Sequence, residues 1–546
     1  MSWTRREALL GLGSIPVLGA VWWAGAYGTV GKKRQRDALL EQLNIQPSLP
    51  SPVPAITGEP VRLGIIGFGI RGEQLCRSLG YATDEWIADM EAAAERARQE
   101  DRPFTALEDF QKQDPLNVRI VGVCDVFDIR AEKAIRSFST PEQTVKRYTT
   151  HTDMILSGDV DAVVIATPDH WHAPMSIEAL RNNVHVYVEK PMTHTIAETY
   201  ELREAVRNSK AVFQVGHQHR QTLSFKTAQN IVDNGILGHV SLITTNTNRN
   251  DDNGAWNYAI HPDANPQTID WEQFLGSAPK IPFNKNHFFR WRKWWAYGSG
   301  LSGDLLTHDY DRLNCVLKMG MPQSVMASGG IYTHRDGRNV PDVLQVNFEY
   351  PDFSTGNNQN PNNQRGMTFT YSASLGNGFS RPTMLTGHDA SMELGNRLTI
   401  WPDSGSTRYA EQLGARNMTP QTPIYSYDPS ETAIDGVSSA TSQYFADKGL
   451  MWTYIDGKRV DSTFLHMREW LSVIRNGGNV SCGIQEGFEE AMSAHMAGLS
   501  WKLGRRIEWD PKEEVILPIE GVDLDAVLLE SPSGVGQLAP DTVGAL

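Results

Sequence analysis

The chain has 546 residues, enough for two or three domains with a large buried core. A net charge of -14, with no long basic run in the body of the chain, argues against nucleic acid as a partner, because phosphate binding needs clustered lysine and arginine. The four cysteines lie far apart in the sequence, so they indicate neither a CxxC metal site nor a dense disulfide framework.

The N-terminal segment, residues 1–36, has features of an export signal and of a membrane anchor. Arg5 and Arg6 precede an uncharged run from Ala8 to Gly31, which is similar to a twin-arginine signal and is also long enough to span a bilayer. Basic residues from Lys32 to Arg36 would favour a cytoplasmic body by the positive-inside rule. We expect export to the periplasm, because the arginine pair is read by a receptor. Cleavage and retention as an inner-membrane anchor both stay open.

A proline-rich linker, residues 37–60, leads into the first strand-like run. That run, "VRLGIIGFGIRG", is followed by a helical pattern, which is the strand–turn–helix context that a GxGxxG motif needs. The first two glycines allow a tight turn and a close approach to a pyrophosphate, and the third lets the helix pack on the strand. The pattern predicts dinucleotide binding by Gly67, Phe68, Gly69, Ile70, Arg71 and Gly72.

The second strand, "VRIVGVCD", ends at Asp125, a carboxylate placed to bind the adenosine ribose. A carboxylate there favours NAD over NADP, because it would repel a 2′-phosphate. The alternative role for Asp125 is a helix N-cap. Residues 82–117, which separate this strand from the glycine motif, contain an Ala/Glu/Arg-rich stretch that predicts an inserted surface helix.

Alternating strands and helices continue to residue 215, which predicts a doubly wound parallel sheet. Two polar stretches, "TPDHWHAP" and "EKP", follow neighbouring strands, and ligands of such sheets bind beyond the carboxyl ends of the strands. The cofactor site is therefore expected to include Thr167, Pro168, Asp169, His172, Glu189 and Lys190. Lys190 would also donate to a substrate oxygen or take its proton, unless it is only a surface lysine before a turn.

Residues 216–515 have a different sequence pattern, in which β-rich segments are separated by polar loops. Residues 516–546 form an acidic tail. We expect an α/β protein in which an open, mostly antiparallel sheet forms a second, C-terminal domain. Within it, "SGDLLTHDYD" would place Asp304, His308 and Asp311 on one helical face. Read alone, this face could hold a metal, transfer protons, or be a solvated helix start with Asp304 as N-cap.

The set GFGIRG, Asp125, TPDHWH, EKP and GDLLTHDYD resembles the Gfo/Idh/MocA family of glucose–fructose oxidoreductase and inositol dehydrogenase. The resemblance covers roughly residues 61–515. It implies a Rossmann domain followed by an open-faced sheet domain, often used for oligomerisation. It also implies that Lys190, Asp304 and His308 share the proton transfer. A metal site is disfavoured, because the nicotinamide already accepts the hydride, and we expect Asp311 in a supporting role.

Three further groups are candidates for substrate contact. The stretch from Asn286 to Gly300 is rich in aromatic and basic residues, which suits a sugar ring or, equally, a packed core; its candidates are Trp291, Arg292 and Tyr297. "GHQHR" follows another strand and offers His217 and Arg220, which could instead be polar loop residues. Asp311 completes the set.

These expectations favour an NAD(P)-dependent oxidoreductase that acts on a secondary alcohol of a sugar, polyol or glycoside with a tightly bound cofactor. One alternative is a redox-neutral, NAD-dependent glycoside hydrolase, which cleaves a glycoside by transient oxidation, elimination, addition of water and re-reduction. The other is a non-catalytic, membrane-anchored accessory subunit. NAD is the expected cofactor, and a homo-oligomer is the expected assembly.

Overall fold

A computed structural model describes residues 43, 58–102, 104–355, 365–395, 398–414, 420–421, 423–427, 452–455 and 458–530. The expected signal or anchor, most of the linker, and the tail after residue 530 lie outside these residues. Within the described part, no helix is both long and apolar enough to cross a membrane.

The first domain is built on a six-stranded parallel sheet in the order β3-β2-β1-β4-β5-β6. Its central strands are buried along almost their whole length, because helices cover both faces. The strands are β1 (Val61–Ile66), β2 (Val118–Cys124), β3 (Lys146–Arg147), β4 (Ala162–Ile165), β5 (His185–Val188) and β6 (Phe213–Val215). The helices between them are α3 (Ile70–Ser78), α6 (Asp128–Phe138), α7 (His151–Leu156), α8 (His172–Arg181) and α9 (Ile196–Asn208).

The expected inserted surface helix is present as two helices, α4 (Asp84–Gln99) and α5 (Ala106–Gln111). The Thr83 side chain caps α4 by accepting a hydrogen bond from the Trp86 amide. Trp86 packs edge-on against Phe110 of α5, so the two helices form one unit. Only two α4 side chains are fully buried, which explains its Ala/Glu/Arg-rich composition.

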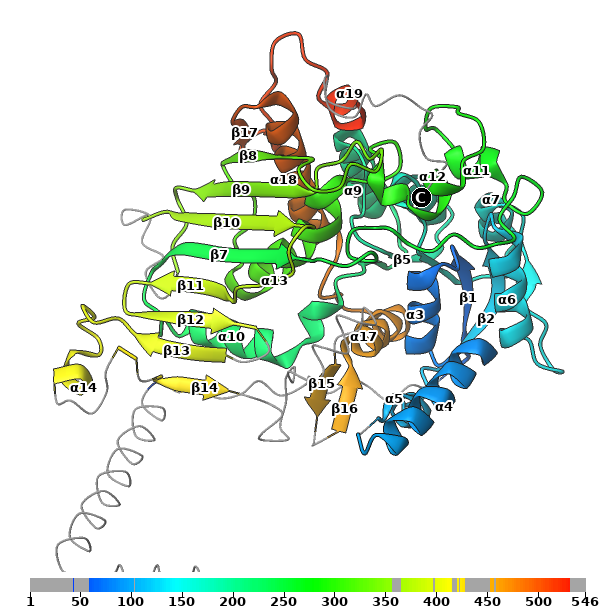
Figure 1. Cartoon of the computed structure of the whole chain (residues 1–546), viewed down its shortest axis with the longest axis horizontal. Coiled ribbons are helices and arrows are strands. Elements are labelled where there is room, and N and C mark those ends of the chain that lie inside the picture. Colours follow the sequence, from blue (N-terminus) through cyan, green and yellow to red (C-terminus); the bar gives the residue numbers. More distant parts are fainter. Residues whose placement is uncertain are drawn as a thin grey trace, which may run out of the picture.

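The second domain carries a ten-stranded sheet in the order β14-β13-β12-β11-β7-β10-β9-β8-β17-β18, in which β7 and β10 pair in parallel and the other described pairs are antiparallel. Burial alternates along the strands, because one face packs on α10 (Leu223–Asp233), α13 (Thr307–Leu317) and α18 (Ile484–Leu503) (Figure 1). The strands are β7 (Val240–Asn248), β8 (Ser324–Gly330), β9 (Val343–Tyr350), β10 (Met367–Ser374), β11 (Thr383–Gly387), β12 (Ala390–Leu394), β13 (Leu398–Pro402), β14 (Tyr425–Tyr427), β17 (Ile507–Asp510) and β18 (Val515–Ile516). The expected α/β architecture is confirmed.

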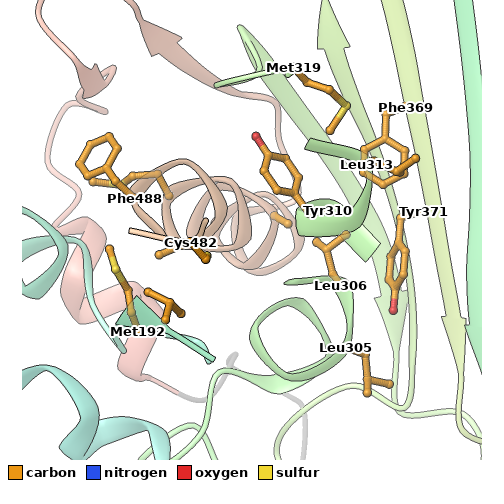
Figure 2. Packing of buried hydrophobic residues seen from close by; sticks show 14 of the residues in the cluster. Met192, Leu305, Leu306, Tyr310, Leu313, Met319, Phe369, Tyr371, Cys482 and Phe488 are labelled. Carbon is orange, nitrogen blue, oxygen red and sulfur yellow. The ribbon is translucent and has the colours of Figure 1, made fainter. Parts of the chain in front are cut away.

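Helix α18 is central to the second domain. It is buried on nearly every side, between the sheet and α9 of the first domain. Figure 2 shows how Tyr310 and Leu313 of α13 lie between α18 and the sheet residues Phe369 and Tyr371. This packing fixes α13, and with it the acidic and histidine residues at its start.

Helix α17 (Ser462–Asn476) packs on the first domain although it lies near the end of the chain. Its residues Phe464, Met467 and Trp470 share a buried cluster with the strands of the parallel sheet. The His466 ring bonds the Val215 carbonyl at 2.9 Å, and in Figure 1 α17 lies next to α3. The hydrophobic core of the first domain therefore includes residues on the C-terminal side of the boundary expected at residue 215, because α17 packs into it.

Candidate active site between the two domains

The glycine motif forms the turn from β1 into α3. Gly67 has a φ of +85°, and a Cβ on Gly72 would lie 2.2 Å from the Gly67 carbonyl oxygen, so the turn requires glycine at both positions. Gly69 is the N-cap of α3, and no side chain caps this helix. The amide groups of the first turn are therefore available to an anion.

Asp125 lies at the end of β2 beside this turn. Its Oδ2 accepts a hydrogen bond from the Phe68 amide at 2.6 Å, and its Oδ1 accepts one from the Phe127 amide at 2.8 Å. Burial raises the pKa of this carboxyl, while Arg130 and the two amides act in the opposite direction. Asp125 is not the N-cap of α6, which is Phe127. In this structure it fixes the glycine turn, and its contact with a ribose stays a prediction.

The residues after β4 join the two domains. The buried Asp169 carboxylate accepts hydrogen bonds from the amide and the hydroxyl of Ser299, at 3.0 and 2.9 Å. The His172 ring lies between two carbonyl oxygens, those of Thr167 and Pro191, at 2.8 and 2.7 Å. Thr167 and Pro168 are thus held by the loop that also carries Lys190.

The Glu189 side chain forms an ion pair with Arg71 of α3, at 2.7 Å. Arg71 also donates to Gln218, so it connects α3 to the segment after β6. Arg71 and Glu189 were both expected to contact the cofactor, and the structure places them in one hydrogen-bond network at the carboxyl edge of the sheet. Ile70, at the first position of α3, is 63% exposed.

Lys190 and Asp304 meet across the domain boundary. The Lys190 ammonium group donates to the Asp304 carboxylate at 3.0 Å and to the Asp304 carbonyl oxygen at 2.5 Å. Asp304 belongs to η4 (Ser302–Leu306), a π-helical turn that leads directly into α13. Such turns recur at functional sites because they alter the helical register locally.

Asp304 has two further partners from the second domain. Arg292 donates from Nε to the same oxygen as Lys190, and the indole of Trp256 donates to the other, each at 3.0 Å. Burial disfavours the charged form, but Lys190, Arg292 and Arg249 hold the pKa of this carboxyl well below its usual range. Asp304 is therefore ionised at neutral pH.

His308 lies one turn further along the same helix face. Its ring centroid is 6.0 Å from that of His217 and 5.5 Å from that of His219. No hydrogen bond joins its ring nitrogens to a residue that the structure describes. Burial and the neighbouring cations, Lys190 first among them, lower its pKa well below the usual range. The ring is thus neutral at pH 7, with a nitrogen that can accept a proton.

The matching family model decides how this domain is classified. Residues 61–217 match the model described as "Oxidoreductase family, NAD-binding Rossmann fold" of the Gfo/Idh/MocA group. This domain is similar to the NAD-binding domain of the Gfo/Idh/MocA family. The expected NAD-binding Rossmann domain is therefore confirmed.

Individual proteins of known sequence align with parts of the chain. Inositol 2-dehydrogenase of Salmonella typhimurium (strain LT2) is 31% identical over 127 residues, 23% of this chain and 37% of the relative. Glycosyl hydrolase family 109 protein 2 of Shewanella sp. (strain ANA-3) is 42% identical over 89 residues, 15% of this chain and 20% of the relative. The chain thus spans little more than a third of the length of the first of these.

A solved structure extends the likeness in fold to most of the chain. Levoglucosan dehydrogenase in complex with NADH and levoglucosan superposes with a TM-score of 0.52. The superposition covers 82% of this chain and 99% of the other, at 16% sequence identity. At that identity the likeness concerns the fold.

The first domain fits an NAD molecule. The uncapped start of α3 offers backbone amides to the pyrophosphate, and Gly67, Gly69 and Gly72 add no side chain to the turn. Asp125 lies at the strand end where Rossmann domains bind the ribose, and Lys190 lies three strands away on the same sheet edge. Bound there, NAD would accept a hydride.

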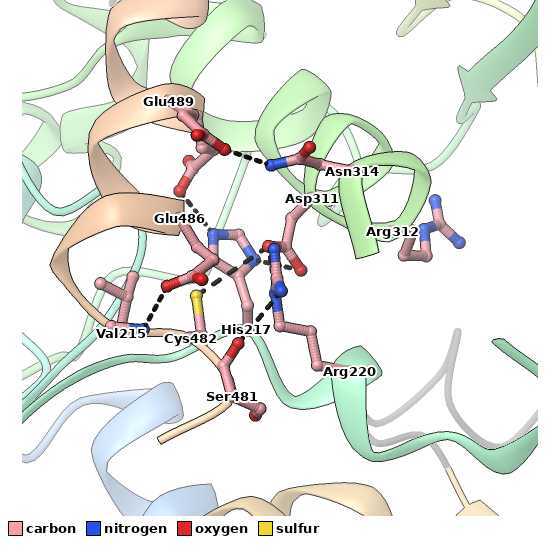
Figure 3. Close-up of polar contacts among 12 residues, drawn as sticks. Val215, His217, Arg220, Asp311, Arg312, Asn314, Ser481, Cys482, Glu486 and Glu489 are labelled. Carbon is pink, nitrogen blue, oxygen red and sulfur yellow. Dashed lines mark hydrogen bonds and ion pairs between the residues drawn. The ribbon is translucent and has the colours of Figure 1, made fainter. Parts of the chain in front are cut away.

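Three of the expected substrate residues form a buried network instead of an open surface. Arg220 pairs with Asp311 at 2.6 Å (Figure 3). His217 bonds Glu490 of α18 at 2.6 Å. His217, Arg220 and Asp311 are at most 8% exposed. Burial lowers the pKa of His217, but Asp311 and Glu490 act more strongly together and raise it. This network lies directly behind His308.

The aromatic stretch divides between the site and a core. Tyr297 is buried in an aromatic cluster with Phe127 and Phe274, which favours the core alternative for this residue. Trp291 remains partly exposed, and the Arg292 guanidinium lies 4.2 Å from its ring centroid. Arg292 thus connects an aromatic surface to Asp304.

Two residues of the site were not found from the sequence. Trp256 lies in a polar loop, and no local pattern marks an indole whose partner is 48 residues away. Glu490 lies on α18, which the sequence analysis did not predict. Among the described residues, no group of three or more His, Cys, Asp or Glu side chains could hold a metal.

Proposed function

We propose that this protein is an NAD-dependent oxidoreductase that acts on a secondary alcohol of a sugar, polyol or glycoside. The observation that carries the proposal is the junction of Lys190, Asp304 and the unbonded His308 at the carboxyl edge of the NAD-binding sheet. Relatives named inositol 2-dehydrogenase and levoglucosan dehydrogenase act on substrates of this kind, which supports it.

The residues fit the two transfers that alcohol oxidation requires. NAD, when bound, supplies the hydride acceptor. His308 takes the hydroxyl proton, since its ring is neutral and has no partner among the described side chains. The Lys190 ammonium stabilises the negative charge that develops on the same oxygen, and Asp304 holds Lys190 in place.

The first experiment is to purify the protein without added nucleotide and to identify any bound cofactor by absorbance and mass spectrometry. The second is to test a panel of sugars, polyols and aryl glycosides and to record NADH at 340 nm. We expect Lys190→Ala and His308→Ala to lose turnover and to keep the cofactor. Unchanged rates in both variants would refute the site, and a protein that binds no nucleotide would favour the accessory subunit.

A second candidate is a redox-neutral glycoside hydrolase that uses the same residues. The likeness to glycosyl hydrolase family 109 protein 2 over 89 residues favours it. Hydride removed from the sugar would return to it after elimination and addition of water, so NAD would be regenerated within one cycle. Release of free sugar from an aryl glycoside without net NADH would select this reaction.

We also propose that the chain is exported through its Arg5–Arg6 signal and assembles into a homo-oligomer. Fractionation of cells that express the full chain, with Arg5→Lys/Arg6→Lys as the matched variant, tests export. Extraction with alkali and with detergent separates a cleaved signal from a retained anchor. Light scattering on the purified protein gives the number of subunits.

A further inference from the structure

Arg292 has hydrogen-bond donors that the protein does not use. Its Nε donates to Asp304, whereas neither terminal nitrogen bonds to a described residue. The side chain is 26% exposed, and its guanidinium lies over the Trp291 ring. A planar fork of two donors is therefore open beside the catalytic carboxylate.

Arg249 is a second arginine of this kind. Thr245 and Thr247 of β7 both direct their hydroxyls to Asp309 of α13, at 3.5 and 2.6 Å. Side chains alternate along a strand, and the Arg249 amide continues the pairing with β10. Arg249 therefore emerges on the same side, toward Asp304, and it is half-buried without a side-chain hydrogen bond or ion pair to a described residue.

The charges around Asp304 do not balance within the described chain. Three cations, Lys190, Arg292 and Arg249, act on this one carboxylate. Asp169, which accepts hydrogen bonds from Ser299, also acts on Lys190 and Arg292, so two carboxylates face these three cations, and Asp309 is paired with Arg312. Partly buried cations without counter-ions are unfavourable, and an anionic ligand would relieve that cost.

We propose that the substrate is an anionic sugar, whose carboxylate or phosphate group is bound by Arg249 and Arg292. This rests on the function proposed above and specifies its substrate class. An arginine fork binds either oxyanion through two parallel hydrogen bonds, and the exposed edge of Trp291 would carry the sugar ring. His308 and the third N–H of Lys190 remain available for the hydroxyl that reacts.

The test compares matched sugars on the NAD-loaded full chain by calorimetry. Glucose is compared with glucuronate and glucose 6-phosphate, and galactose with galacturonate and galactose 6-phosphate. At least one anionic sugar should bind about tenfold or more tightly than its neutral counterpart, and added salt should reduce the difference. Comparison of the sugar acids with the sugar phosphates shows whether the site prefers a carboxylate or a phosphate group.

Arg249→Gln should weaken binding of the anionic sugar about tenfold or more beyond any change in binding of its neutral counterpart, and so remove the preference. Arg381→Gln is the matched control, because Arg381 is an exposed arginine of the same domain. The proposal is overturned if no anionic sugar binds more tightly than its neutral counterpart, or if Arg249→Gln weakens both equally.

NADH formation separates this inference from the proposed function. If neutral sugars alone reduce NAD, the oxidoreductase function stands and the anionic substrate is refuted. If anionic sugars bind through Arg249 but no sugar of the panel is oxidised or cleaved, the anion site stands and the proposed function is refuted.

Discussion

The Lys190 ammonium group donates to both the carbonyl oxygen and the carboxylate of Asp304, a residue 114 positions away in the other domain. Lys190, two residues after the end of β5 in the NAD-binding sheet, is thereby tied to the first turn of the helical segment that carries His308. The candidate site exists only while the two domains are docked.

Asp304→Asn tests this connection. The variant keeps the shape of the side chain but removes the negative charge between Lys190 and Arg292. Because two partly buried cations then lack their partner, the free energy of unfolding should fall by about 3–5 kcal/mol. Turnover should fall about 10²–10⁴-fold. Urea unfolding and NADH formation measure the two effects, and a full rate with normal stability would contradict the assignment.

Trp256→Phe tests the orientation of the same carboxylate. Trp256 is fully buried and has a φ of +64°, a rare conformation for a bulky residue. Two contacts fix its loop: Lys293 donates to the Asn257 side chain, and Arg338 donates to the Ala255 carbonyl oxygen. Loss of the indole donor leaves Asp304 Oδ2 without its partner, which should cost about 1–3 kcal/mol. We expect kcat to fall more than KM rises. A change in KM alone would indicate that Trp256 contacts the substrate instead.

Two alanine variants of the glycine motif separate folding from cofactor binding. In Gly72→Ala the new Cβ would meet the Gly67 carbonyl, so the melting temperature should drop. In Gly69→Ala the nearest atom is 3.6 Å away, on Arg130, so the fold should persist. If the pyrophosphate lies against this turn, NAD affinity should still fall about tenfold or more in Gly69→Ala. Calorimetry with NAD measures it, and an unchanged affinity would place the cofactor elsewhere.

Asp311→Asn tests the buried network behind His308. It removes the partner of Arg220 and one of the two carboxylates near His217, so we expect a loss of about 3–5 kcal/mol. The matched control is Asp161→Asn, which breaks the exposed pair with Arg62 and should cost about 1 kcal/mol or less. Equal losses in denaturant unfolding would show that the network does not support the fold.

Stability should decline in acid because several histidines are buried in the neutral form. Burial lowers the pKa of His170 and His194 to about 4 and that of His495 to about 3. Between pH 6.5 and 4 the unfolded chain binds protons that the folded chain does not, so stability is lost as pH falls through this range.

Glu198 acts in the opposite sense. Burial raises its pKa to about 7, so its contribution is present below pH 4.5 and is lost as pH rises toward 7. Urea midpoints at pH 7, 6, 5 and 4 should fall steadily, because three histidines outweigh one glutamate. His495→Asn should flatten the curve and Glu198→Gln should steepen it; the reverse order would contradict the assignment of these groups.

Local patterns were sufficient to predict the parallel sheet and its cofactor turn. Strands buried on both faces read as continuous apolar runs, and the glycine spacing is a property of one short segment. Helix α18 was missed for a physical reason: it is buried nearly all round, so its sequence lacks the polar stripe that marks a surface helix.

Proximity across long separations was harder to predict. The strand ends predicted that Lys190 follows a strand at the carboxyl edge of the sheet, where the structure has it, and helical spacing linked Asp304 to His308. Nothing in the sequence places Trp256 against Asp304 or Glu490 against His217, since tertiary packing alone brings them together. The same packing buries Tyr297 and Asp311, which the sequence offered as substrate contacts.

The position of α17 makes the first domain dependent on almost the whole chain. Strands β1 to β6 leave the ribosome within the first 215 residues, but the hydrophobic surface that Phe464 and Trp470 cover stays exposed until some 250 further residues have been made. A fragment that ends at residue 215 should therefore aggregate, whereas the complete chain closes its NAD-binding core last. A nascent protein of this kind acquires its cofactor site only near the end of synthesis.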